Sequence, residues 1–164
     1  MRAEPAIALS DVVTLLRSSE VALKEDDFRM QQSIVVGVNG LEHEPHLEWA
    51  IVAAKLWSSD LLVVHCFEGS LDPEIPDPDQ MSRHRAENVL ERSVSNALSN
   101  GIRAEPRLSE GFPGKVLVEV SEGARLLVIG SSHRSRLSHA MHASISTYCV
   151  RHAQCPVTIV PTHN

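Results

Sequence analysis

Apolar positions along the chain fall into two patterns: short, nearly continuous runs, and longer stretches in which they recur every three or four residues. The runs at 33–39 and 60–67 are rich in β-branched residues and apolar on both faces. Such runs are typical of strands inside a parallel sheet that helices cover on both sides. Between them, apolar residues recur at helical spacing after Pro45, which suits a first helical turn. The unit is therefore β-α-β, and the expected buried stripe of its helix consists of Leu47, Ala50, Ile51, Ala54 and Trp57.

The same alternation continues to the end of the chain. Residues 68–80 are rich in Pro and Asp and predict an exposed connection. A long amphipathic helix is expected over 80–101, where Gly101 suits the C-terminal cap. Its expected buried stripe contains Met81, Ala86, Val89, Leu90, Val94, Ala97 and Leu98. The remaining expected elements are a strand at 102–111 whose Pro106 suits a sheet edge, a helix at 113–124, a strand at 125–130, a helix at 141–153 and a strand at 155–161.

This order of elements predicts an α/β fold with a single doubly wound, five-stranded parallel sheet in three α/β/α layers and right-handed crossovers. The sheet domain is expected to span residues 31–164. Residues 1–30 stand apart as an N-terminal helical extension, in which Val12, Leu15, Leu16 and Val21 recur at roughly helical spacing. Two interpretations of this extension stay open: it packs on its own domain or frays, or its apolar side docks on a partner subunit.

The composition of the chain argues against nucleic acid and membrane partners and leaves the predicted fold unchanged. The 164 residues are 43% hydrophobic and 22% charged, which is ordinary for one globular domain. A net charge of -6 argues against a general affinity for nucleic acid. No apolar run approaches the roughly 20 residues that span a bilayer, and the first residues do not form a signal peptide pattern. Three cysteines without a CxxC pair predict reduced thiols in a cytoplasmic protein.

A ligand is expected where the strand order of an open parallel sheet reverses, outside the carboxyl ends of the strands. The first and fourth strands are the usual neighbours there, so the turn at Asn39 and the loop from Gly130 should face one crevice. Helix N-termini also point there, and their free amides favour an anion. Gly130 opens into a loop with hydroxyl side chains and with Arg134 and Arg136, which suit phosphate oxygens. The sequence predicts a crevice for a phosphate-bearing ligand, and a solvated polar loop is the alternative.

Four segments, at 34–50, 111–131, 130–144 and 152–161, resemble the universal stress protein family in their residues, order and spacing. The resemblance covers residues 33–161 and leaves only the N-terminal extension outside. It implies a Rossmann-like sheet of the adenine nucleotide alpha hydrolase-like kind, a homodimer, and a non-enzymatic role in the stress response. It also implies nucleotide binding, because many members of the family bind ATP.

The resemblance further implies which positions would hold the nucleotide. In ATP-binding members the loop after the fourth strand reads Gly, two residues, Gly, nine residues, Gly, and then Ser or Thr. Here these positions are Gly130, His133, Ala143 and Ser144, and Asn39 stands where an Asp is usual. His133 adds bulk over the phosphate path, and Asn39 lacks the charge that suits ribose hydroxyls or a metal. The crevice is therefore expected to be degenerate.

The ligand implied by the resemblance is ATP or AMP, with Mg²⁺ if ATP binds. A second interpretation stays open, in which the chain is a structural, homodimeric protein-interaction module that no longer binds nucleotide. The homodimer is expected to form through the last strand, from Val157 to Val160, whose apolar edge needs a cover. The expected nucleotide-binding residues are Val38, Asn39, Val64, Ile129, Gly130, Ser131, Ser132, His133, Ala143 and Ser144.

Catalytic chemistry is not expected. The chain lacks a G-x-S-x-G nucleophile elbow and the Lys of a P-loop. His139 and His142 are three residues apart and would share one face of a helix. No Cys or carboxylate lies near them in sequence to complete a metal site, so solvent-facing side chains are the favoured interpretation. The sequence thus predicts a binding or interaction protein.

Overall fold

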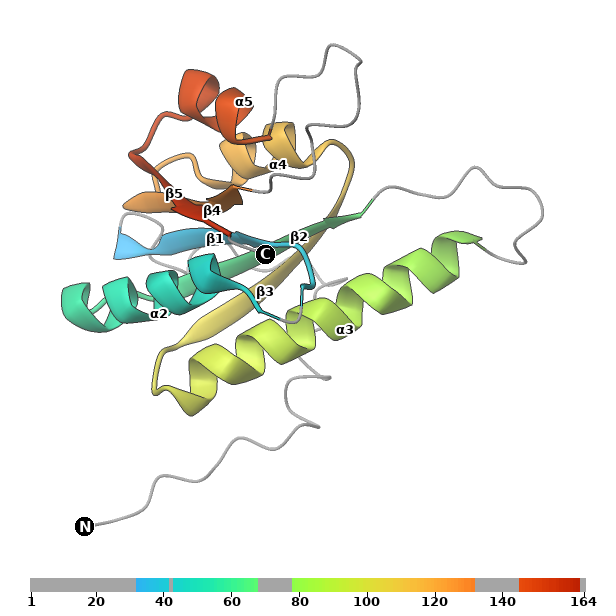
Figure 1. Cartoon of the computed structure of the whole chain (residues 1–164), viewed down its shortest axis with the longest axis horizontal. Coiled ribbons are helices and arrows are strands. Elements are labelled where there is room, and N and C mark those ends of the chain that lie inside the picture. Colours follow the sequence, from blue (N-terminus) through green and yellow to red (C-terminus); the bar gives the residue numbers. More distant parts are fainter. Residues whose placement is uncertain (1–31, 42, 68–77, 132–144, 163–164) are drawn as a thin grey trace.

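The computed structural model describes residues 32–41, 43–67, 78–131 and 145–162, in which five strands alternate with four helices. This alternation confirms the predicted order and type of the elements (Figure 1). The elements are β1 (Ile34–Val38), α2 (Pro45–Trp57), β2 (Leu61–Phe67), α3 (Pro78–Ser99), β3 (Ala104–Glu110), α4 (Pro113–Val120), β4 (Leu126–Ser131), α5 (Ile145–His152) and β5 (Val157–Pro161).

The five strands form one parallel sheet in the order β3-β2-β1-β4-β5. In chain order, β1 lies in the centre of the sheet and β2 and β3 follow on one side of it. The chain then crosses to the other side, where β4 lies next to β1 and β5 lies at the edge. This reversal makes the sheet doubly wound. Helices α2 and α3 cover one face, and α4 and α5 cover the other (Figure 1). The predicted three-layer fold is confirmed.

Alternate residues of the central strands enter two separate cores. Val36 and Val63 pack with α2 and α3, whereas Val35 and Val64 pack with α4 and α5. Because both faces are covered, neither face of β1 or β2 requires polar residues, which explains their continuous apolar sequences. Pro106 lies in the edge strand β3, opposite Val63, where its missing N–H group leaves no ladder bond unmade.

The buried stripe predicted for α2 is confirmed at four positions and wrong at the fifth. Leu47, Ala50, Ile51 and Ala54 are buried. Trp57 is 41% exposed, because it is the last residue of the helix. The guanidinium carbon of Arg125 lies 5.2 Å from the centre of the Trp57 ring, so a cation covers part of the indole in place of the core.

Several features expected from the sequence lie outside the described residues, so what the sequence predicts for them remains a prediction. They are the extension at 1–30, the loop positions Ser132, His133, Ala143 and Ser144, the two arginines Arg134 and Arg136, and the histidine pair His139 and His142. Among the described helices, none combines the length and the apolar character that crossing a membrane requires.

Candidate crevice at the carboxyl ends of β1 and β4

Strands β1 and β4 are parallel neighbours in the centre of the sheet. Ile34 pairs with Leu126, Val35 with Leu127 and Val36 with Val128. In this register Asn39, directly after β1, and Ser131, the last residue of β4, leave the sheet at the same edge. The ends of β1 and β4, at Asn39 and Gly130, are therefore neighbours as predicted, at the point where the strand order reverses.

The loop after β1 is held by a carboxylate from its own far end. The backbone N–H groups of Asn39 and Gly40 both donate to Oε1 of Glu44, each over 2.8 Å. Glu44 is 8% exposed, and its backbone carbonyl accepts from the N–H groups of Leu47 and Glu48, which begins α2. Gly40 has a φ of +79°, a conformation that permits this tight loop. A fixed negative charge therefore sits at the carboxyl end of β1.

The side-chain oxygen of Asn39 takes part in the loop rather than pointing freely into the crevice. Its Oδ1 accepts a hydrogen bond of 3.1 Å from the backbone N–H of Leu41, which is an Asx-type turn. The charge that position 39 lacks is thus present nearby on Glu44. Glu44 was not among the expected site residues, although an acidic residue directly before Pro45, at the start of a helix, was the signal that would have found it.

Gly130 contacts a buried histidine that sequence reasoning also missed. A Cβ atom on Gly130 would lie 2.8 Å from Nδ1 of His46 and 3.1 Å from Cγ2 of Thr162. Gly130 does not have a positive φ. Absence of a side chain at this position is therefore required by the packing of His46, whatever ligand the following loop holds.

The His46 imidazole is 1% exposed, and its Nδ1 has no hydrogen-bond partner in the described part of the chain. Burial lowers the pKa of His46, while the carboxylate of Glu44 and a hydrogen bond to the backbone of Gly37 oppose the change. The ring is therefore neutral near pH 7 and brings no positive charge to the crevice.

The three apolar residues expected to contact a base do not share one face of the sheet. Val38 is buried in the core with α2 and α3, whereas Val64 and Ile129 are buried in the core with α4 and α5. His65, at the end of β2, is half-buried, and its Nδ1 lies 2.8 Å from the carbonyl oxygen of Val38. Ser131 is tied to β5, because the hydroxyl of Thr162 donates to its carbonyl oxygen.

A cavity of 160 Å³ lies beside this edge, between the β1–α2 loop and α3. Its polar groups are the carboxylates of Glu44 and Glu48 and the side chains of Arg92, Ser93 and Asn96. Of the expected nucleotide-binding residues, those that the structure describes (Val38, Asn39, Val64, Ile129, Gly130 and Ser131) do not line this cavity. The cavity adjoins the end of β1 through Gly40, Leu41 and Glu44 of the β1–α2 loop.

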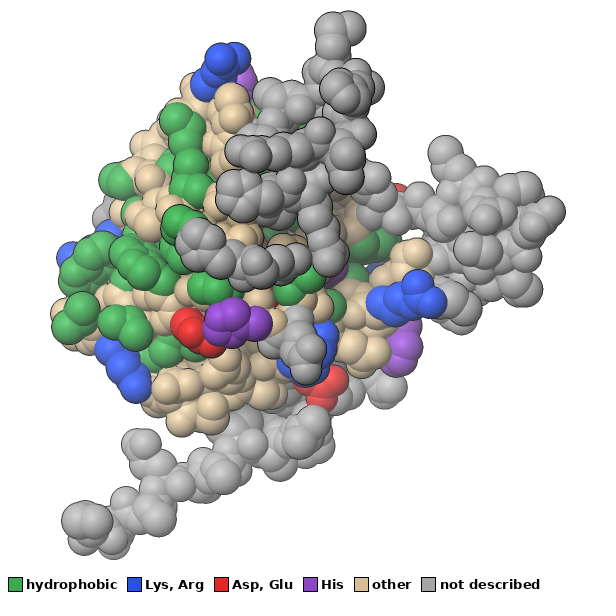
Figure 2. All heavy atoms as spheres, viewed as in Figure 1, with side chains coloured by type: hydrophobic (Ala, Val, Ile, Leu, Met, Phe, Trp, Pro, Cys, Tyr) green, Lys and Arg blue, Asp and Glu red, His purple; other side chains and the backbone are tan. Residues whose placement is uncertain are grey.

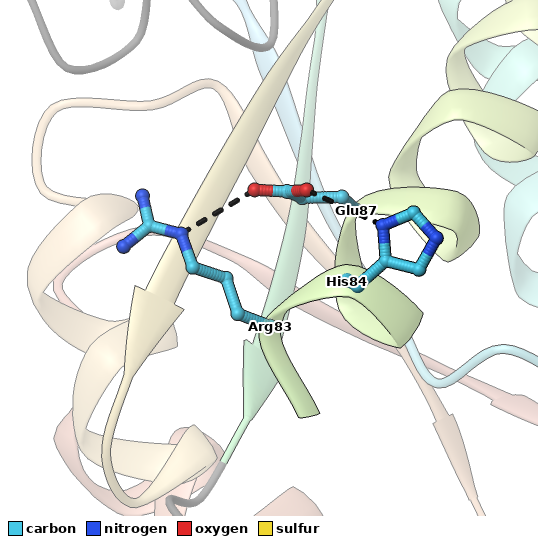
Figure 3. A network of polar contacts seen from close by, with 3 residues as sticks. All are labelled: Arg83, His84 and Glu87. Atoms are coloured by element: carbon cyan, nitrogen blue, oxygen red, sulfur yellow. Dashed lines mark hydrogen bonds and ion pairs between the residues drawn. The ribbon is translucent and has the colours of Figure 1, made fainter. Parts of the chain in front are cut away.

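Other reactive side chains do not form a second centre in the described residues. Cys66, Cys149 and Cys155 are free, and no group of three or more His, Cys, Asp or Glu side chains is arranged to hold a metal there. On α3, Glu87 contacts Arg83 at 3.3 Å and His84 at 4.0 Å (Figure 3). These are exposed side chains one turn apart, which is a solvated surface pairing rather than a site.

Comparison with known proteins gives one consistent result. A model of the Universal stress protein family matches residues 30–161. Universal stress protein Rv2005c of Mycobacterium tuberculosis is 31% identical over 144 residues, which are 80% of this chain and 48% of the relative. Universal stress protein Slr1101 of Synechocystis is 30% identical over 77 residues, which are 46% of this chain and 71% of the relative. The chain spans about half the length of the mycobacterial relatives that it matches.

Solved structures show the same fold. A universal stress protein in complex with cAMP superposes with a TM-score of 0.63 at 22% identity, covering 79% of this chain and 96% of the other. A universal stress protein of Archaeoglobus fulgidus in complex with dAMP has a TM-score of 0.59 at 23% identity, covering 79% and 98%. An Arabidopsis thaliana family protein with AMP bound has a TM-score of 0.57 at 21% identity, covering 80% and 92%.

Proposed function

The chain belongs to the universal stress protein family, and we propose that it is a non-enzymatic stress-response module with a weak adenine-nucleotide site at the carboxyl ends of β1 and β4. The observation that carries this proposal is the parallel pairing of β1 with β4, which brings Asn39 and Ser131 to one edge. Family structures that hold cAMP, dAMP and AMP are the reason to test adenine nucleotides first.

The charges at this edge orient the proposed ligand. The Glu44 carboxylate already binds the backbone amides of Asn39 and Gly40, so a phosphate at the end of β1 would meet a negative charge and would have to compete for these two donors. A carboxylate suits hydroxyl groups instead, so the ribose belongs at the β1 end. The phosphates then extend from Gly130 and Ser131 into the loop that includes His133, Ala143 and Ser144. Mg²⁺ would accompany a triphosphate.

Weak binding is supported by one described residue, His46, and by the sequence of the loop after β4. His46, beneath Gly130, is neutral and offers no positive charge to a phosphate. His133 and Ala143 replace two glycines of the loop, and each adds atoms where a backbone amide would approach a phosphate. The site is therefore expected to favour a small nucleotide such as AMP over ATP.

Thermal unfolding in the presence of AMP, cAMP, ATP with Mg²⁺, or GMP tests the proposal. A ligand at 100 times its Kd stabilises the folded state by about 2.7 kcal/mol, which raises the unfolding midpoint visibly. The double variant His133→Gly with Ala143→Gly is expected to increase the shift, whereas Arg83→Ala, in the exposed pairing on α3, leaves it unchanged. If neither the wild type nor the double variant shifts with any nucleotide, the site is not a nucleotide site.

A structural role as a homodimer is the second candidate, and the position of β5 favours it. β5 is an edge strand paired with β4, and its Ile159 is 41% exposed. A second copy could add its own β5 to this edge through a two-fold contact. The mycobacterial relatives are about twice as long as this chain, which leaves room in each of them for a second domain of similar size.

Sedimentation of the wild type and of Ile159→Lys tests the dimer. The wild type is expected to sediment at twice the 18.0 kDa chain mass, and Ile159→Lys at the monomer mass with an unchanged far-UV spectrum. A wild-type monomer would contradict the dimer and leave the nucleotide proposal untouched. The three free cysteines support a reducing compartment such as the cytoplasm.

A further inference from the structure

The outer face of α2 carries large apolar side chains that face away from the core. Trp49, Val52 and Leu56 are 39%, 56% and 76% exposed. They are spaced three and four residues apart, so they form one stripe along the helix, opposite the buried Ala50 and Ile51. Figure 2 shows hydrophobic side chains gathered over this helix. Trp49, Val52 and Leu56 together form the outer stripe of α2.

An exposed helix face of a globular domain is normally polar, so an apolar stripe at helical spacing points to a covering element. The stripe is too small to be a stable interface alone. Interfaces between separate proteins bury about 800 Å² on each partner. Three partly exposed side chains supply less apolar area than that. A segment tethered to the same chain needs far less area, because the tether gives it a millimolar effective concentration.

We propose that the N-terminal segment around residues 12–21 of this same chain docks on the outer stripe. The described part of the chain begins beside α2. The carbonyl oxygen of Ser33 accepts a hydrogen bond of 2.9 Å from the backbone N–H of Arg125. The guanidinium of Arg125 in turn donates to the carbonyl oxygen of Trp57 over 3.2 Å. The preceding residues therefore enter the domain next to the C-terminal end of α2, where Leu56 lies.

The sequence of the segment matches the stripe in spacing and length. Val12, Leu15 and Leu16 lie three and four residues apart, which gives a helix one apolar side. The outer stripe extends over eight residues of helix, from Trp49 to Leu56, about 10 Å. Residues 22–32 can span up to about 35 Å when extended, which is enough to return the segment along α2. The docked segment would bury its own apolar side and the outer stripe together.

Tryptophan fluorescence of the full chain tests this docking, because both tryptophans of the protein belong to α2. Trp57→Phe leaves Trp49 as the reporter, and Trp49→Phe leaves Trp57, which Arg125 partly covers, as the control. Adding Leu15→Asp with Leu16→Asp is expected to shift the Trp49 emission to the red and to raise its quenching by iodide several-fold. The Trp57 reporter is expected to change much less.

Two results would overturn the proposal. One is Trp49 emission and quenching that do not respond to the Leu15→Asp and Leu16→Asp changes. The other is protection of Trp49 that disappears on dilution, because a second copy would then be the occupant. Should the double Asp variant fail to fold, hydrogen exchange of the wild type and of Leu56→Asp, a largely exposed position, decides instead. Amides around 12–21 are expected to be protected in the wild type and to lose that protection in Leu56→Asp, and equal exchange in both proteins would also overturn the docking.

Discussion

The imidazole of His46 lies against the backbone of Gly130, so that a Cβ on Gly130 would approach its Nδ1 to 2.8 Å. The two residues are far apart in sequence and join the start of α2 to the end of β4. Gly130 is the first residue of the proposed phosphate loop. The contact therefore links the position of that loop to the packing of one buried ring.

Gly130→Ala is expected to lower the free energy of unfolding by about 1–3 kcal/mol, because the added methyl group meets a ring that is buried and unable to move aside cheaply. Urea unfolding measures the loss. The same substitution in a His46→Ala background is expected to cost less, since the clashing atom is gone. An equal cost in both backgrounds would show that the ring is not what excludes a side chain at 130.

The pH dependence of stability gives a second test of His46. Burial lowers the pKa of this ring below its ordinary value of 6.5, so the unfolded chain takes up the proton at a higher pH than the folded one. The contribution of the neutral His46 ring to the free energy of unfolding is fully present above about pH 6.5. It is lost as the pH falls from there through the lowered pKa of the folded protein.

The wild type is therefore expected to lose more stability than His46→Gln between about pH 7.5 and about pH 5.5. Urea unfolding of both proteins at the two pH values measures this difference. The comparison cancels the other titrating groups, which the two proteins share. Identical losses in wild type and His46→Gln would mean that the ring is not held neutral in the folded protein.

The fold was predictable because each element leaves a periodic mark in the sequence. Strands such as β1 are buried on both faces and appear as continuous apolar runs, and α2 shows its buried face at helical spacing. Trp57 fits that spacing too, but the pattern does not show where the helix leaves the core. Trp57 is the last residue of α2, and the Arg125 guanidinium that partly covers its ring comes from 68 residues further along the chain.

The site was less predictable, because its contacts depend on where individual side chains turn. The end of β1 and the end of β4 were placed correctly as neighbours from the order of elements. The family resemblance implies that Gly130 begins a nucleotide loop, and the structure adds the packing of His46 as an immediate reason for a glycine there. Likewise, the carboxylate at the end of β1 comes from Glu44, whose side chain folds back to Asn39. The position of Glu44 directly before Pro45 marks a helix start, but it does not show that the carboxylate binds the amides of Asn39 and Gly40, and the contact of His46 with Gly130 has no local sequence signature.

Removing the Glu44 carboxylate is expected to loosen the loop after β1. Glu44→Ala leaves the amides of Asn39 and Gly40 without their shared acceptor, at a cost of about 1–3 kcal/mol in the free energy of unfolding. Glu44→Gln keeps a carbonyl acceptor and is expected to cost less. Amide hydrogen exchange at Asn39 and Gly40, followed by NMR, reports the loss directly. Unchanged exchange in Glu44→Ala would contradict the role of this carboxylate.

The cysteines provide a prediction about reactivity in the folded state. Burial raises the pKa of Cys66 and of Cys149 to about 11, and neighbouring thiols add to the effect. Because the thiolate is the reacting species, about one in a thousand of these groups is reactive at about pH 8. The native protein is expected to release at most one equivalent of thionitrobenzoate quickly from Ellman's reagent, from the half-buried Cys155.

Denaturation is expected to release all three equivalents at once, since the chain contains three cysteines without a disulfide. Cys155→Ser serves as the matched control, because it removes the one thiol whose fast reaction is expected and leaves the two slow ones. Rapid release of two or more equivalents from the native wild type would contradict the prediction, and release of all three would show that the buried Cys149 becomes accessible. In that case the half-buried Cys66 and the buried Cys149 would not react as slowly as their raised pKa values predict.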